Sequence, residues 1–215
     1  MARKSVGHVV LLGDSIFDNK SYVGRGPDVV TQLRDALPPD WRATLLAVDG
    51  DVISGVARQL RGLPADATHL VVSVGGNDAL RVAGLLDQRP TSIAAALLTL
   101  KQEQDPFAAA YEAMLDTVGG TGLPVAVCTI YDTPPSESLY PVIRTGLAVF
   151  NDVITRAAFR RGMPLIDLRI ICDEDADYAN PIEPSVRGGA KISVAIGSFA
   201  LGTGSGRSVV VASAD

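Results

Sequence analysis

The sequence predicts a doubly wound α/β domain with a five-stranded parallel sheet. Apolar runs rich in Val, Leu and Ile alternate along the chain with stretches of helical periodicity or composition, which is typical of βαβ units. These runs lack the polar alternation of a half-exposed sheet, so helices should cover both faces. The length of 215 residues fits one domain. Right-handed crossovers leave few topologies, of which we expect the flavodoxin-like strand order 2-1-3-4-5.

Five strands and four main helices follow from this pattern. We expect the strands at residues 7–12, 43–48, 69–74, 123–130 and 164–168, and the helices at 27–36, 52–61, 105–118 and 142–161. The Ala-rich segment 91–103 predicts a separate helix, a flap over the edge of the strands. No linker divides the chain, so residues 1–201 should form one domain. Residues 202–215 should form a flexible tail or an added edge strand that contacts a second copy.

Composition narrows the functional classes. The net charge of −5 argues against a nucleic-acid partner, which requires a basic face. No apolar run approaches a membrane span or a complete signal peptide, so we expect a cytoplasmic protein. Cys128 and Cys172 should be reduced, buried thiols. With two His and no clustered Cys, no metal site is expected.

Three strand ends carry residues that suit acyl transfer. The first apolar run stops abruptly at Gly13 and Asp14 and is followed by Ser15, while Gly50 follows the second run and Asn77 the third. The carboxyl ends of neighbouring parallel strands open onto one crevice, so these residues should converge there. A serine hydroxyl can attack a carbonyl carbon, and an N–H and an amide can stabilise the oxyanion that forms.

These segments resemble the blocks of the SGNH hydrolases, also called GDSL-type lipases and esterases. The sequence Val-Leu-Leu-Gly-Asp-Ser at 10–15 is similar to the first block, Ala-Val-Asp-Gly at 47–50 to the second, and Val-Gly-Gly-Asn-Asp at 74–78 to the third. The resemblance implies a three-layer α/β/α fold and hydrolysis of ester, thioester or O-acetyl bonds without a cofactor. It also implies that Ser15 is the nucleophile and that Ser15, Gly50 and Asn77 form the oxyanion hole.

The fourth block departs from that family's pattern. The family has Asp-x-x-His there, and its His is the general base. Here the matching stretch is Asn-Pro-Ile-Glu at 180–183, which puts Glu183 in the place of the His and Asn180 in that of the Asp. The two histidines, His8 and His69, lie at the amino ends of predicted strands, on the far side of the sheet from Ser15. We expect them to be solvated or capping residues.

A glutamate can replace the histidine if its pKa is raised. The ordinary pKa of Glu is about 4.3, against about 6.5 for His, and burial in an apolar crevice can raise a Glu to about 6–7. A neutral Asn180 can orient an anionic Glu183 by donating a hydrogen bond, whereas an Asp would repel it. Two alternatives remain open. Glu183 could be a solvated loop residue in a protein that has lost activity, or the base could come from the acidic cluster 173–177, with Asp177 first.

The sequence therefore predicts a cofactor-free serine esterase that acts on small acyl esters through Ser15 and Glu183. Few aromatic residues and no long apolar lid argue against a long-chain lipase. Asp14 and Asp78 should position their turns rather than exchange protons. The alternatives are a carbohydrate O-acetylesterase, a lysophospholipase or thioesterase, and a non-catalytic module that binds an acylated or glycan ligand.

Overall fold

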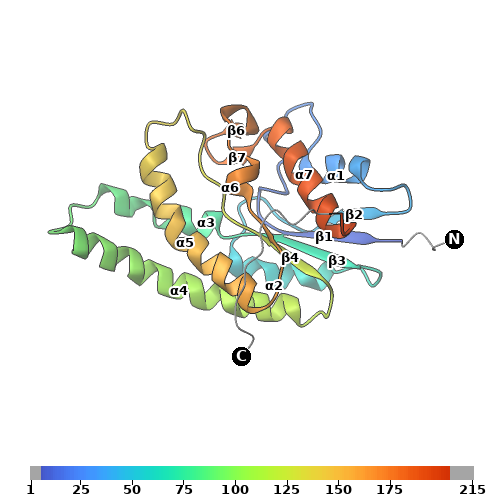
Figure 1. Ribbon diagram of the computed structural model, residues 1–215, viewed down its shortest axis with the longest axis horizontal. Coiled ribbons are helices and arrows are strands. Elements are labelled where there is room, and N and C mark those ends of the chain that lie inside the picture. Colours follow the sequence, from blue (N-terminus) through green and yellow to red (C-terminus); the bar gives the residue numbers. More distant parts are fainter. Residues whose placement is uncertain (1–5, 204–215) are drawn as a thin grey trace.

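A five-stranded parallel sheet forms the centre of the molecule, in a computed structural model that describes residues 6–203 (Figure 1). The strand order β2-β1-β3-β4-β5 is the one predicted. The strands are β1 (His8–Gly13), β2 (Arg42–Leu45), β3 (His69–Ser73), β4 (Val125–Cys128) and β5 (Leu165–Ile166). Each strand pairs in parallel with its neighbours in the sheet, so all five carboxyl ends lie on one side.

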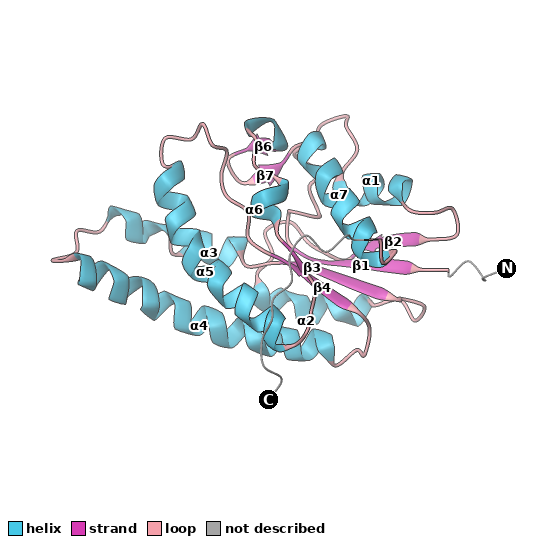
Figure 2. Cartoon of the chain, in the orientation of Figure 1, coloured by secondary structure: helices cyan, strands magenta, loops and turns pink. Residues whose placement is uncertain are grey.

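Helices cover both faces of the sheet and complete the three layers (Figure 2). One face packs against α1 (Val29–Ala36), α6 (Leu168–Ile171) and α7 (Val186–Ala200), and the other against α2 (Val56–Gln59), α4 (Ile93–Gly119) and α5 (Tyr140–Arg160). Along β1, Val9 and Leu11 belong to the first core, while Val10 and Leu12 belong to the second. This alternation explains why the strands are apolar on both faces.

The predicted flap is wrong as a separate element. One helix, α4 (Ile93–Gly119), takes in most of both predicted segments and runs through Pro106. Proline removes one backbone N–H and ordinarily ends a helix before it, which is why the sequence predicts two helices. The second half of α4 buries Phe107, Tyr111 and Leu115 against the sheet and α5. This packing holds α4 together, and its first half extends beyond the sheet with exposed apolar side chains.

Short elements connect the main ones. They are η1 (Ile53–Gly55), η2 (Leu60–Gly62), α3 (Gly76–Arg81), η3 (Ala83–Asp87), η4 (Asp175–Asp177) and the antiparallel pair β6 (Tyr178–Asn180) and β7 (Glu183–Pro184). The helix predicted at 52–61 is thus a series of short turns. The β6–β7 hairpin stands apart from the main sheet, next to α7 (Figure 1).

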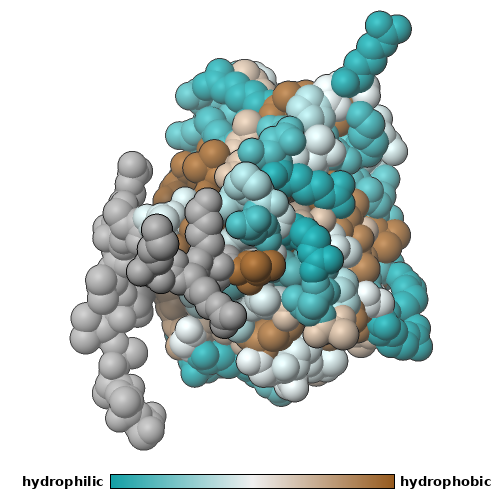
Figure 3. Space-filling model, turned by 90° about the vertical axis from the view of Figure 1, so that its right-hand side faces the viewer, coloured by the Kyte–Doolittle hydropathy of each residue, from teal (hydrophilic) through white to brown (hydrophobic). Residues whose placement is uncertain are grey.

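The histidines lie at the opposite side of the sheet, where β1 and β3 begin, as predicted. The expectation that both are solvated or capping is wrong for His8, which is buried between Asp66 and Thr44 at 3.1 and 2.7 Å. His69 packs its ring against Trp41. Hydrophilic and hydrophobic residues are intermingled on this face of the molecule (Figure 3).

Cys128 and Cys172 are both free and buried, as predicted. No helix within residues 6–203 combines the length and apolar character needed to cross a membrane. Most of the predicted tail, residues 204–215, lies outside the described part of the chain.

Candidate active site

Ser15 stands directly after the turn that ends β1. Gly13 has a φ of 127°, a conformation open to glycine, and packs so closely on the Ser73 carbonyl that a side chain would not fit. The Gln59 side-chain amide binds both backbone groups of Gly13: it accepts from the N–H at 2.8 Å and donates to the carbonyl at 2.7 Å. These bonds fix the turn, and Ser15 is only 6% exposed.

Asn77 lies in the first turn of α3 and lines the same cavity as Ser15. One amide hydrogen of Asn77 is donated to the Asp51 carbonyl at 2.8 Å. The side chain has two such hydrogens, so the other can reach a bound group. Asp78 accepts the Ile53 N–H at 3.0 Å and fixes its loop, as expected. Gly50, with a φ of 76°, is exposed and is not among the described residues that line the cavity.

Glu183 meets Ser15 from the opposite side of the cavity. It is the first residue of β7, and its side chain is buried. Burial raises the pKa of Glu183 to about 7; the neighbouring Ser15 hydroxyl opposes this shift, and the Asp49 carboxylate adds to it. Oε2 of Glu183 has no hydrogen-bond partner among the described residues. The pair thus consists of a serine hydroxyl and a carboxylate that binds a proton near neutral pH.

Two buried side chains hold the Glu183 segment in place, and the sequence did not point to either. Asn19 is fully buried, donates to the Pro184 carbonyl at 3.1 Å and accepts the Val29 N–H at 3.0 Å. Tyr131 donates to the Ile182 carbonyl at 2.8 Å. The position of Tyr131 directly after the predicted fourth strand could have identified it as a crevice residue, because strand ends line the crevice. Asn19 gave no such signal.

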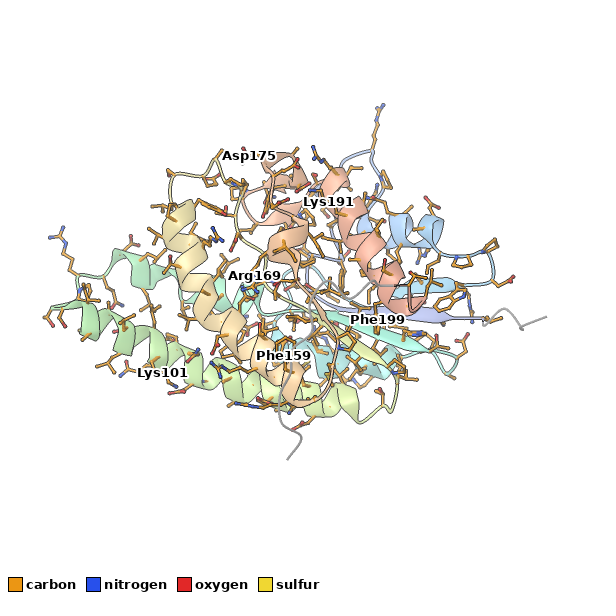
Figure 4. The ribbon with its side chains drawn as sticks, viewed as in Figure 1. Lys101, Phe159, Arg169, Asp175, Lys191 and Phe199 are labelled. Atoms are coloured by element: carbon orange, nitrogen blue, oxygen red, sulfur yellow. The ribbon has the colours of Figure 1, made fainter. Side chains whose placement is uncertain are left out.

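Asn180 and Asp177 have structural contacts of their own. Asn180 Oδ1 accepts the Ile182 N–H at 2.9 Å and closes the β6–β7 turn. No hydrogen bond from Asn180 to the Glu183 carboxylate is found among the described residues, although such a bond was expected. Asp177 Oδ2 accepts from Lys191 at 2.7 Å, and Oδ1 lies 3.5 Å from the Arg187 guanidinium. Lys191 projects from α7 on the side of the molecule where Asp175 lies (Figure 4). These ion pairs make Asp177 a poor alternative base.

Asp14 is buried beside Ser15 and lines the cavity. Its Oδ1 accepts the Ile16 N–H at 3.2 Å, as expected of a turn residue. Burial raises the pKa of Asp14 to about 8; the hydrogen bond from Ile16 opposes this, and the Glu183 and Asp78 carboxylates add to it. Below about pH 8 Asp14 is therefore mostly neutral and adds little negative charge beside Ser15.

The cavity beside Ser15 has a volume of about 240 Å³. Its walls come from the ends of β1, β3 and β4, from α3, η3, α4 and α5, and from the β6–β7 turn. Within residues 6–203, no group of three or more His, Cys, Asp or Glu side chains is arranged to hold a metal ion.

Comparison with solved structures shows the same fold in several hydrolases. A phospholipase A1 from Streptomyces albidoflavus has a TM-score of 0.67 and 18% identity, covering 91% of this chain and 100% of its own. The acetyl xylan esterase AlAXEase has a TM-score of 0.67 and 16% identity, with 89% and 98% covered. An extracellular lipase from Streptomyces rimosus has a TM-score of 0.66 and 17% identity, with 90% and 99% covered.

Comparison with curated proteins gives no match. The model of the GDSL-like lipase/acylhydrolase family, in contrast, matches residues 11–190, from the end of β1 into α7. The matched range contains Ser15, Gly50, Asn77 and Glu183. The chain belongs to the GDSL-like lipase/acylhydrolase family.

Proposed function

We propose that this chain is a serine ester hydrolase in which Glu183 takes the place of a catalytic histidine. One observation carries the proposal: the buried Glu183 carboxylate lines the same cavity as Ser15, where burial raises its pKa to about 7. A general base works best when its pKa lies near the working pH. Membership of the family supports a hydrolase.

The proposed reaction has two halves. The Ser15 oxygen attacks the ester carbonyl carbon while its proton passes to Glu183. The Asn77 amide and the Ser15 N–H stabilise the oxyanion. The resemblance to the family adds the Gly50 N–H as a third donor, which would have to approach from outside the cavity lining. The C–O bond to the alcohol then breaks, and Glu183 returns the proton to the leaving oxygen. Water next attacks the acyl-Ser15 carbonyl while Glu183 accepts a proton from it. The C–O bond to Ser15 then breaks, Glu183 returns the proton to the Ser15 oxygen, and the acid leaves.

The surroundings of Glu183 suit a general base that gains and loses a proton in each half of the reaction. The anionic form is opposed by burial and by Asp49, which increases its proton affinity. A neutral Asp14 avoids a second negative charge beside the oxyanion. The substrates we propose are esters of small acyl groups, hydrolysed in the cytoplasm without a cofactor. The free, buried thiols Cys128 and Cys172 fit a reducing compartment.

The test is Glu183→Gln, which keeps the shape of the side chain and removes the proton acceptor. Turnover of a chromogenic acetate ester should fall by about 10²–10⁴. In the unaltered protein kcat/KM should rise with pH along one deprotonation near pH 7, since Glu183 acts in its charged form. Glu174→Gln is the matched control, because Glu174 is an exposed carboxylate of the same segment paired with Arg187. It should leave turnover unchanged.

A double change tests the same role from the other direction. Glu183→His alone should be poorly active, since Asn180 cannot stabilise an imidazolium. Adding Asn180→Asp should restore activity beyond the sum of the separate effects, as expected of two residues that are paired across the β6–β7 hairpin. Full activity in Glu183→Gln would exclude this base. Absence of turnover in the unaltered protein, with every ester tried, would favour the binding module instead.

A further inference from the structure

Asp14 is a buried carboxyl group without a cationic partner. It is 3% exposed and lines the cavity beside Ser15. The same lining holds the carboxyl groups of Asp132 and Glu183, and no Lys, Arg or His is among its described residues. A carboxylate is costly to bury when no cation is paired with it, and such a group keeps its proton instead. The surroundings of Asp14 therefore favour the neutral carboxylic acid.

The titratable groups that face Asp14 from neighbouring elements favour the same form. Glu183 on β7 and Asp78 on α3 are carboxyl groups, which oppose a negative charge on Asp14. The others are uncharged groups whose pKa values are raised by burial, namely the Tyr111 hydroxyl of α4, the Cys128 thiol of β4 and the Tyr131 hydroxyl after β4. Burial is the largest cause that raises the pKa of Asp14, which reaches about 8.

The second oxygen of Asp14 is free and lies next to the segment that carries Asn77. Oδ1 of Asp14 accepts the Ile16 N–H at 3.2 Å, whereas no hydrogen bond to Oδ2 is found among the described residues. Oδ2 lies on the side of Gly76, since a Cβ atom built on that glycine would be 3.9 Å from it. Gly76 directly precedes Asn77, and both line the cavity. Because Oδ1 already accepts an N–H, the proton of a neutral Asp14 belongs on Oδ2.

We propose that the Asp14 carboxylic acid donates a hydrogen bond from Oδ2 to the substrate oxyanion, beside the Ser15 N–H and the Asn77 amide. This inference rests on the proposed function and adds a donor inside the cavity lining, where Gly50 is not found. Hydrogen bonds from an O–H to an anionic oxygen are short and strong, and a carboxylic acid kept neutral by an apolar site can serve an oxyanion hole. The proton stays on Asp14, because Glu183 takes and returns the proton of Ser15.

The experiment measures kcat/KM for a chromogenic acetate ester as a function of pH. The reaction requires Glu183 charged and Asp14 neutral, so kcat/KM should rise along one deprotonation and fall along a second, with its maximum between about pH 7 and 8. In Asp14→Asn the falling limb should disappear, because the amide donates a hydrogen bond without titrating and still accepts the Ile16 N–H. A role of Asp14 in the turn alone predicts no falling limb that depends on this carboxyl group.

Three further variants sharpen the test. Asp14→Ala removes the donor, so kcat should fall by about 10²–10³ with a modest change in KM, and Asp14→Asn should recover most of this loss. Asp78→Asn keeps an acceptor for the Ile53 N–H and removes a carboxylate that raises the pKa of Asp14, so the falling limb should move to lower pH. Asp152→Asn, at an exposed site paired with Arg156, is the matched control and should leave both limbs in place.

The outcomes separate this inference from the proposed function. A falling limb that disappears in Asp14→Asn, with kcat kept there and lost in Asp14→Ala, supports donation by Asp14. If Glu183→Gln loses turnover as expected but the limb is absent from the unaltered protein, or persists in Asp14→Asn, the role of Asp14 is overturned and the proposed function stands. If the unaltered protein turns over no ester, the proposed function fails and the role of Asp14 fails with it.

Discussion

The two sides of the crevice are held by different means. On one side, Ser15 and Asn77 follow the central strands β1 and β3, which pair along five residues, and backbone bonds fix the turns after them. On the other side, Glu183 lies on a two-residue strand outside the main sheet. There, single bonds from the Asn19 and Tyr131 side chains hold the neighbouring carbonyls.

This difference shows which part of the site can change its chemistry most readily. A residue whose position is set by the register of a central strand can move only if the sheet moves with it. A residue on a separate hairpin can be replaced as long as its few side-chain supports remain. The replacement of the family's histidine by Glu183 that we propose falls on the second side, while the residues that resemble the family's first and third blocks lie on the first.

The strongest test of the side of the crevice that follows β1 and β3, here called the strand side, is Ser15→Ala. Turnover of a chromogenic ester should fall by roughly 10⁴-fold or more, because the nucleophile is gone. The melting temperature should stay nearly unchanged, since strand register and not the hydroxyl places this turn. Labelling by a fluorophosphonate should disappear in parallel. A variant that keeps a tenth of the activity would remove Ser15 from the reaction.

The next largest effect should come from Asn77→Ala. If its amide stabilises the oxyanion, kcat should fall by about 10²–10³ with a modest change in KM. Steady-state kinetics with one ester separates the two constants. A change confined to KM would mean that Asn77 binds the ground state, and the strand side would then contribute the nucleophile alone.

Comparing Asn19→Ala with Gln59→Ala sharpens the contrast between the two sides. Each wild-type side chain is buried and bonds backbone groups, Asn19 at Pro184 and Gln59 at Gly13. Each change should cost about 1–3 kcal/mol of unfolding free energy for a backbone group left unpaired. The kcat should fall about tenfold in Asn19→Ala and less in Gln59→Ala, because strand pairing also places Gly13.

Denaturant unfolding and a pH–rate profile check this pair of variants. Misplacement of Glu183 should also shift the pH at which the rate of Asn19→Ala is half-maximal, an effect that lost stability alone does not produce. Equal effects of the two variants on kcat, with unshifted pH profiles, would remove the distinction between the two sides.

The same contrast explains what could be predicted from the sequence. Strand order and the convergence of Ser15 with Asn77 follow from apolar periodicity, because a strand end fixes the place of the residue after it. Glu183 could be located by its position in the fourth block. The role of Asn19 could not, because its partner Pro184 lies 165 residues away in the sequence and a single Asn carries no pattern. Similarly, the buried contacts of His8 and the continuity of α4 through Pro106 depend on tertiary packing that outweighs local signals.

The last prediction concerns the pH dependence of stability rather than turnover, and it involves Asp14, a residue that follows β1 beside Ser15. Its pKa is about 8 in the folded protein and that of Glu183 about 7, against ordinary values of 3.8 and 4.5. At a pH between the ordinary and the raised pKa of each group, the carboxyl group is deprotonated in the unfolded chain and still protonated in the folded protein. Stability should therefore fall as pH rises from about 4 to 8, by at most about 1.4 kcal/mol per pH unit for each group.

Asp14→Asn should make this decline shallower up to about pH 8, because an amide keeps the acceptor for the Ile16 N–H and does not titrate. Denaturant unfolding at several pH values between 5 and 8 measures the slope, and Asp152→Asn, at an exposed site paired with Arg156, controls for the substitution itself. An unchanged slope in Asp14→Asn would mean that Asp14 is already charged in the folded protein. The strand side would then present a second negative charge next to Glu183, and the proton affinity of the base would depend on the Asp14 carboxylate as well as on burial.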